Sequence, residues 1–335
     1  MVSTIGLMLW GLSTAAAQEV VVNIDQDVAD TFGIDSTEAS DGITSSINEG
    51  LNLVDQEAFL QSMANAAAMS SKGMGVDYAS NIKRFMFGAS FGSAVNSAGF
   101  SFGRGGRELP EDGFSFQVSA MAGLNLGFSN PDGFLGRVKL YANGMQLSTG
   151  GDSFNGTLTN LGGHLQLQLA KPRSGTGVEW GGLALTSGYD ISQYSLDLVQ
   201  ALPVDTEIDG NDLSWSAEGT YTVAAETASV PVELSTNVRL AILTLYAGGG
   251  VDYNLVGEAT SSISLAGPLD VSSSGQTATL GDASISMSGS AIADQLTPRF
   301  FGGAQVGLSV LKVYGHLNVG LNNSVGGHIG ARVAL

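Results

Sequence analysis

Three histidines, His164, His316 and His328, are the side chains of this chain best suited to acid–base or metal chemistry. Their spacing matches no HExxH helix or other metal-binding pattern, and the chain has no cysteine for a thiolate site. Any of them could approach a Ser and an Asp on the inner face of a sheet, as a membrane-embedded hydrolase or acyltransferase requires, but no local spacing supports such a triad. We therefore expect no enzyme, no catalytic or metal-ligating residue and no cofactor.

Two other segments resemble ligand-binding loops, and each lacks a necessary part. The stretch from Asp205 to Asp212 has the carboxylate density of a calcium loop, but its twelfth position is Ser216, where a bidentate Glu is needed. The GRGG stretch at residues 103–106 is a turn with no helix after it, so it is no phosphate loop. We expect residues 205–212 to form a solvated external loop. The alternative is that their carboxylates bind divalent cations that bridge to anionic lipid headgroups.

Composition excludes several classes of protein. The chain has 335 residues, 47 of them Gly, with 13% charged residues, 43% hydrophobic residues and a formal net charge of −18. A chain this acidic does not attract phosphates, so nucleic acid is not an expected partner. The missing cysteines exclude a disulfide framework and suit a protein that crosses the periplasm unfolded.

The elements that would position these side chains are strands. Residues 161–170, LGGHLQLQLA, alternate strictly, so that Leu165 and Leu167 point one way while His164, Gln166 and Gln168 point the other. The same period of two recurs from about Phe85 to Leu335, and no apolar run is long enough for a spanning helix. This pattern predicts an all-β fold, a transmembrane antiparallel β-barrel of about twelve strands, within a range of 10–14.

Strand boundaries follow from the Gly, Asn, Asp and Ser clusters between the alternating runs. A bilayer needs only about 9–11 tilted residues per strand, so many strands should continue beyond the membrane as an extended wall. Turns are expected at residues 130–133 and 171–175, and long external loops at 143–157, 189–212 and 261–295, on the opposite end of the barrel. The expected strands are 83–104, 112–128, 133–147, 156–171, 177–194, 212–226, 229–243, 245–263, 296–310, 312–322 and 325–335, with weaker strand material at 266–290.

Inward positions follow from the same alternation, because an unpaired Lys or Arg facing hydrocarbon at mid-membrane costs roughly 2–4 kcal/mol. The two open interpretations are a weakly selective aqueous channel and a filled barrel whose charges pair with one another. The predicted lumen-lining residues are Arg137, Lys139, His164, Gln166, Gln168, Glu218, Glu233, Arg239, Asp252, Asn254, His316, Asn318, His328 and Arg332.

The chain before the barrel divides in two. Residues 1–17 are typical of a secretory signal peptide, with an apolar stretch at 5–12 and Ala15, Ala16 and Ala17 before a cleavage site, although no Lys or Arg precedes the apolar stretch. Residues 18–81 form an acidic N-terminal periplasmic or lumenal segment with one helix at 55–71, and residues 82–335 form the barrel. The helix could pack against the barrel, act as a gating plug or bind a partner.

Two hairpin corners, at residues 242–245 and 310–313, are apolar on both faces and lack the Asn-Gly or Asp-Gly chemistry of a wet turn. They should lie in lipid or against protein. One interpretation is a barrel rim covered by the helix at 55–71; the other is a second lipid-facing or subunit-facing surface inside an oligomer.

The signal-like start, the alternating strands and the last strand, HIGARVAL at residues 328–335, resemble the porin-like outer-membrane β-barrels of Gram-negative bacteria. The resemblance implies a bacterial outer-membrane location, with outer-membrane lipids, lipopolysaccharide and the barrel-insertion machinery as partners. The chain departs from that family by ending in Leu335 where Phe or Trp is usual. Its apolar hairpins and helix also resemble the oligomeric, lipid-enclosing porin-like proteins of predatory bacteria, which implies a homo-oligomer.

Three functions are therefore open. The first is a porin-like passive channel for small solutes, which we expect from the inward charges. The second is a structural or lipid-enclosing oligomeric assembly of the outer membrane, and the third is a barrel that binds or adheres through long acidic loops.

Overall fold

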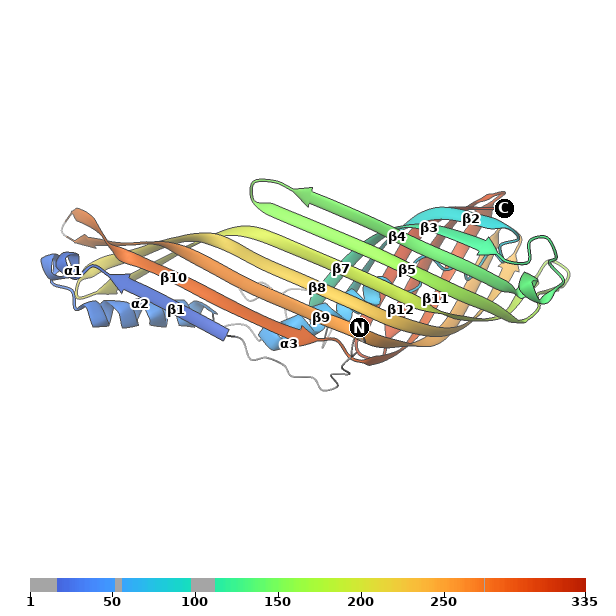
Figure 1. Cartoon of the computed structure of the whole chain (residues 1–335), viewed down its shortest axis with the longest axis horizontal. Coiled ribbons are helices and arrows are strands. Elements are labelled where there is room, and N and C mark those ends of the chain that lie inside the picture. The colour runs from blue at the N-terminus through green and yellow to red at the C-terminus, as the bar shows by residue number, and fades with distance from the viewer. Residues whose placement is uncertain (1–16, 52–55, 98–111, 274) are drawn as a thin grey trace, which may run out of the picture.

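A computed structural model describes residues 17–51, 56–97, 112–273 and 275–335, in which thirteen strands make one antiparallel sheet (Figure 1). Part of this sheet closes into a ring, because the last strand pairs with the first strand of the ring, from Ser324 opposite Asn96 to Ala334 opposite Met86. The ring strands are β2 (Phe85–Asn96), β3 (Gly113–Asn125), β4 (Val138–Gly150), β5 (Phe154–Ala170), β7 (Glu179–Ile208), β8 (Asn211–Leu240), β9 (Leu243–Ser273), β11 (Leu296–Leu308), β12 (Leu311–Gly320) and β13 (Ser324–Ala334). The predicted all-β barrel is confirmed, and these ten strands lie within the expected range.

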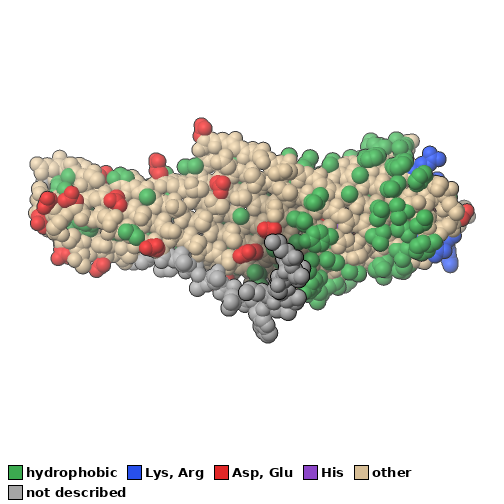
Figure 2. All heavy atoms as spheres, in the orientation of Figure 1, with side chains coloured by type: hydrophobic (Ala, Val, Ile, Leu, Met, Phe, Trp, Pro, Cys, Tyr) green, Lys and Arg blue, Asp and Glu red, His purple; other side chains and the backbone are tan. Residues whose placement is uncertain are grey.

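Alternation along each strand determines which side chains meet lipid. In β5, Leu161 and Leu165 are about half exposed on the outside, while His164 and Gln166, which flank Leu165, are buried inside. Figure 2 shows outward apolar side chains gathered on the visible face of the barrel, toward one end of the molecule, and we call them the apolar band. With 10 residues, β12 has the length that a bilayer requires of a tilted strand. The closed ring and its apolar band are those of an outer-membrane β-barrel.

Three ring strands, β7, β8 and β9, continue far beyond the apolar band. We call the part of the molecule built on these extensions the arm. β7 and β8 have 30 residues each and β9 has 31, so each spans roughly 100 Å at about 3.3 Å per residue. The predicted break between residues 226 and 229 is wrong, because β8 runs through it with only a register shift against β9. The external loops predicted at 143–157, 189–212 and 261–295 are also wrong, since these residues are mostly strand. Their serines and threonines pair within a sheet, so polarity here marks a solvated sheet face.

The arm is completed by the N-terminal part of the chain. β1 (Ala17–Ile24) pairs with β10 (Gln276–Ile292), which pairs with β9, and the order across the arm is β7-β8-β9-β10-β1. A two-residue strand, β6 (Arg173–Ser174), pairs with the start of β7 at the other end of the molecule. The predicted signal peptide lies almost wholly outside the described residues, and its cleavage site would follow the first residue of β1.

Two short helices, α1 (Gln26–Phe32) and α2 (Ser36–Leu51), cover one face of the arm. Acidic residues begin both helices: Asp25 accepts hydrogen bonds from the Asp27 and Val28 amides, and Asp35 accepts them from the Thr37 and Glu38 amides. The bonds to Asp35 hold the pKa of its carboxyl below the usual range. Two acids of the N-terminal acidic stretch, Asp25 and Asp35, thus act as helix caps, although the only helix predicted for residues 18–81 is the one at 55–71.

Apolar residues of these helices form a core with the arm sheet. Trp215 of β8 is fully buried there against Ile43 of α2, and its indole Nε1 donates to the carbonyls of Gly267 and Ala283 at 3.2 and 3.1 Å. The arm is therefore a two-layer unit, helices on sheet, although its strands are continuous with the barrel.

The third helix, α3 (Gln56–Ser70), occupies the range in which the sequence predicts a helix and packs against β2, β3, β8, β9 and β10 where the arm leaves the barrel. A single 3-10 turn, η1 (Phe134–Arg137), precedes β4. No helix in the described ranges is both long and apolar enough to cross a membrane.

The two apolar corners are tight hairpin turns at the end of the barrel opposite the arm. Leu240 pairs with Leu243, and Leu308 with Leu311, so each turn has two residues. Because α3 lies at the arm end, the prediction that this helix covers the corners is wrong. Ile242, at the tip of the first corner, is accordingly uncovered, with 61% of its surface exposed.

Candidate functional site

The interior of the ring holds the chain that follows α3. Residues 71–79 are all buried, and we call residues 71–82 the plug. The plug bends at Gly75, whose φ of +87° is left-handed, and a Cβ atom there would lie 2.6 Å from Asn143 Oδ1. Only glycine meets both demands. The segment enters beside the arm and emerges before β2, so it passes along the length of the lumen.

One buried ion pair fixes the middle of the plug to the wall. Arg332 of β13 donates to Asp77 Oδ1 at 2.6 Å and to the Val76 carbonyl at 3.3 Å, and both charged side chains are essentially inaccessible. Asp77 also accepts from the amides of Ala79 and Ser80 at 2.9 and 2.7 Å. The Asp77 carboxylate therefore stabilises the turn of the plug and also anchors the plug to β13.

A second buried cation, Arg299, connects its own strand to three other strands of the wall. Arg299 of β11 bonds Asp252 Oδ2 of β9 at 2.7 Å and Asn318 Oδ1 of β12 at 2.7 Å, and also pairs with Glu233 of β8. Tyr78 of the plug donates its hydroxyl to the other oxygen of Glu233 at 2.6 Å. The plug thus shares a carboxylate with the wall network.

Polar contacts continue along both ends of the plug. Lys72 donates to Ser229 of β8, and its carbonyl accepts from Asn318. Near the opposite end, Lys139 of β4 donates to Asn81 Oδ1 at 3.2 Å, and Arg239 donates to the Ser80 carbonyl at 3.3 Å. A void beside Lys72 has a volume of about 10 Å³, the space of about one water molecule.

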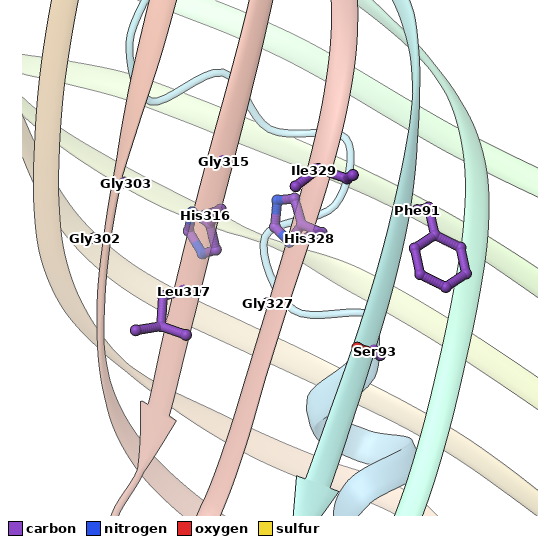
Figure 3. Close-up of a pocket in the computed structure, with 10 residues that line it drawn as sticks. All are labelled: Phe91, Ser93, Gly302, Gly303, Gly315, His316, Leu317, Gly327, His328 and Ile329. Atoms are coloured by element: carbon purple, nitrogen blue, oxygen red, sulfur yellow. The ribbon is translucent and has the colours of Figure 1, made fainter.

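Aromatic rings pack around the plug tyrosine. Tyr78 lies 4.9 Å from the Phe301 ring and 5.4 Å from His316, which stacks on His328 at 4.3 Å. On the outer wall over the same strands, glycines leave a hollow of about 430 Å³ between Leu317 and Ile329 (Figure 3). These two side chains are more than half exposed, so the hollow faces the membrane.

Most residues expected to line the lumen are buried in this interior, where they contact the plug or one another. Three lie elsewhere: Arg137 is in η1, Arg239 is half-buried at the barrel end, and Glu218 is exposed on the arm. Arg137 and Glu218 are corrections, because β4 starts at Val138 and not at residue 133 as expected, and because β8 has left the membrane at Glu218. The buried residues are Lys139, His164, Gln166, Gln168, Glu233, Asp252, Asn254, His316, Asn318, His328 and Arg332.

Sequence reasoning missed several interior residues. Arg299 and Asp190 lie on strands with clear alternation, in phase with Phe301 and Ser192, so the period of two could have identified both. Asp77 and Tyr78 belong to a non-periodic segment and carry no such signal.

The interior offers little for catalysis. His164 Nε2 lies 3.2 Å from Asp190 Oδ1, but both side chains are buried among other lumen residues. Within the described residues, no three His, Asp or Glu side chains gather as a metal site would require.

A family model described as Lsa36-like matches residues 15–335. No curated protein matches the chain by sequence. Solved structures similar to it include the toluene transporter TbuX of Ralstonia pickettii, with 9% identity, a TM-score of 0.26 and coverage of 82% of this chain and 93% of that one. The translocator domain of autotransporter NalP from Neisseria meningitidis has 9% identity, a TM-score of 0.28 and coverage of 76% and 89%. These likenesses concern the β-barrel fold alone.

Substitution Asp77→Asn should loosen the plug. Asparagine can still accept from the turn amides, but Arg332 becomes a buried charge without its counterion, which costs about 3–5 kcal/mol. We expect faster hydrogen exchange at residues 76–82 and a lower unfolding temperature. Glu179→Gln is the control, because the Arg239–Glu179 pair is about one-third exposed and contributes only about 0–1 kcal/mol. Unchanged exchange in Asp77→Asn would show that the ion pair does not hold the plug.

Proposed function

The chain belongs to the Lsa36-like family, and we propose that it is a closed outer-membrane barrel that holds an acidic binding arm beyond the membrane. The observation that carries this proposal is the plug: the lumen is occupied by a covalent part of the chain, bonded to strands around the ring. The barrel then serves as an anchor.

The porin-like passive channel expected from the inward charges requires the plug to move. Moving it would break the Arg332–Asp77 pair and the Tyr78–Glu233 bond, both buried. Removing one partner from a buried ion pair typically costs about 3–5 kcal/mol, so an open state would be rare without a trigger. An enzymatic role finds no support in the buried His164–Asp190 pair.

The arm has the character of a binding surface for a cationic partner. Its described residues include no Lys or Arg but many exposed carboxylates, among them Glu207, Asp212 and Glu218. Glu207 and Asp212 lie directly opposite each other on β7 and β8, an arrangement that lowers stability. Charges retained at a cost to stability favour a role in binding a basic protein segment.

The amount of chain beyond the membrane supports an external arm. β7, β8 and β9 extend far past the apolar band at the arm end, whereas the Leu240–Leu243 and Leu308–Leu311 hairpins turn close to the band at the other end, and outer-membrane barrels carry their longer extensions on the extracellular side. The arm then projects from the cell surface.

Planar-bilayer recording of the purified protein tests whether the barrel is closed. We expect no discrete conductance steps from the folded wild-type protein, and intermittent openings from an Asp77→Asn, Tyr78→Phe double variant, in which both anchors of the plug are weakened. Reproducible steps from the wild type would contradict the closed barrel and favour the passive channel.

Cysteine labelling on intact cells tests the direction of the arm, since the chain has no cysteine of its own. An Asp212→Cys variant should react with a membrane-impermeant maleimide, whereas Ser174→Cys, at the opposite end, should react only after the outer membrane is permeabilised. The reverse pattern would place the arm in the periplasm.

Titration with a polylysine peptide tests the binding surface. Neutralising three arm carboxylates together (Glu207→Gln, Asp212→Asn, Glu218→Gln) should weaken binding several-fold without loss of stability, because a like-charge pair is removed. The control replaces the acids at the opposite end, Asp132→Asn with Glu179→Gln, and should bind as the wild type does. Equal binding by both variants would remove the arm as the site.

A further inference from the structure

The exposed cations of the described chain lie at one end of the barrel. The antiparallel order places the start of β2, β4, β7, β9 and β12 and the end of β3, β5, β8, β11 and β13 at the same end, opposite the arm. We call this end the basic rim. Every Lys or Arg in the described ranges that is not buried belongs to it: Lys83, Arg84, Arg137, Lys171, Arg173, Arg239 and Lys312.

Few acids offset these charges. The described side chains of the basic rim include only Asp132 and Glu179 as carboxylates, and Glu179 already pairs with Arg239 at 3.2 Å. Figure 2 shows the cations directly beyond the apolar band, with the acidic side chains gathered mostly toward the other end of the molecule. The protein as a whole is strongly acidic, so this concentration of positive charge is local.

The basic rim also exposes apolar side chains at its turns. Phe134 is 70% exposed, Ile242 61% and Leu308 58%. A site for a soluble polyanion has no need of such groups, which cost free energy in water. At a membrane boundary, however, apolar turn tips can enter the acyl region while neighbouring Lys and Arg extend to the phosphates.

We propose that the basic rim binds the phosphate headgroups of anionic lipids in the leaflet that surrounds it. The cations supply the attraction to phosphate, and the exposed turn residues hold the rim at the depth where headgroups lie. This interaction is independent of the arm and of whether the barrel conducts. It also gives the apolar corners a lipid environment.

A tryptophan within the basic rim can report on the lipid. Trp180 of β7 donates its indole Nε1 to Thr236 at 2.8 Å, and the Arg173 guanidinium lies 5.9 Å from its ring. Arg239 lies on β8, the strand that pairs with β7 beside Trp180. Trp215, by contrast, is buried in the arm core and should not sense lipid.

The experiment measures quenching of Trp180 emission in vesicles of phosphatidylcholine that contain a minor fraction of phosphatidylglycerol. Bromine atoms are placed on the acyl chains of one lipid or the other, and the signal of a Trp180→Phe variant is subtracted. We expect phosphatidylglycerol to be enriched several-fold at Trp180 over its bulk fraction. Enrichment should fall at high salt, since the Debye length shortens from about 10 Å at 0.1 M to about 3 Å at 1 M.

The test variant carries Lys171→Gln, Arg173→Gln and Arg239→Gln, and its folding is checked by heat-modifiable gel mobility. Its enrichment should disappear, while the arm variant with Glu207, Asp212 and Glu218 neutralised should keep it. Absence of enrichment in the wild type, or its persistence in the test variant, would overturn the proposal. A salt-sensitive shift of Trp180 emission with soluble polyphosphate, without lipid enrichment, would assign the basic rim to a soluble polyanion and also overturn it.

Discussion

Charge burial inside the ring is the constraint on which the rest of this structure depends. Arg299 and Arg332 are both at most 2% exposed, and a buried guanidinium is tolerated only when carboxylates and amides meet its donors. Wall strands alone satisfy Arg299, through Asp252 and Glu233. Arg332 needs Asp77 of the plug, so the wall and the plug cannot be considered separately.

The same continuity joins the barrel to the arm. β8 carries Glu233 in the interior network and Trp215 in the arm core, on one uninterrupted strand of 30 residues. The helices that cover the arm, α1 and α2, and the plug that fills the barrel both belong to the N-terminal part of the chain, with α3 between them. One sheet therefore borders a polar interior in the barrel and an apolar core in the arm. A different part of the N-terminal chain covers the sheet in each place.

Sequence reasoning predicted the barrel better than the arm, for a physical reason. In β5 and β12 one face meets lipid and the other a polar interior, so Leu165 and His164, or Leu317 and His316, differ sharply and the period of two is plain. In the arm the uncovered face carries small and polar residues, and in β10 only Leu280 and Ile285 are large buried residues of the covered face, so this strand looks like a loop in sequence. Inward residues such as Asp252 and His328 followed from alternation, whereas Asp77 and Tyr78 depend on tertiary contacts that no periodic pattern records.

The path of the plug has a topological consequence. Its N-terminal side is tied to the arm, where β1 pairs with β10 from Ala17 opposite Ser288 to Ile24 opposite Gly281, and its C-terminal side continues directly into β2. The segment is therefore threaded through a ring that closes only when β13 joins β2. Once both the β2–β13 seam and the β1–β10 pairing have formed, neither end of the segment is free to pass through the ring. Threading therefore has to precede whichever of these two pairings forms last.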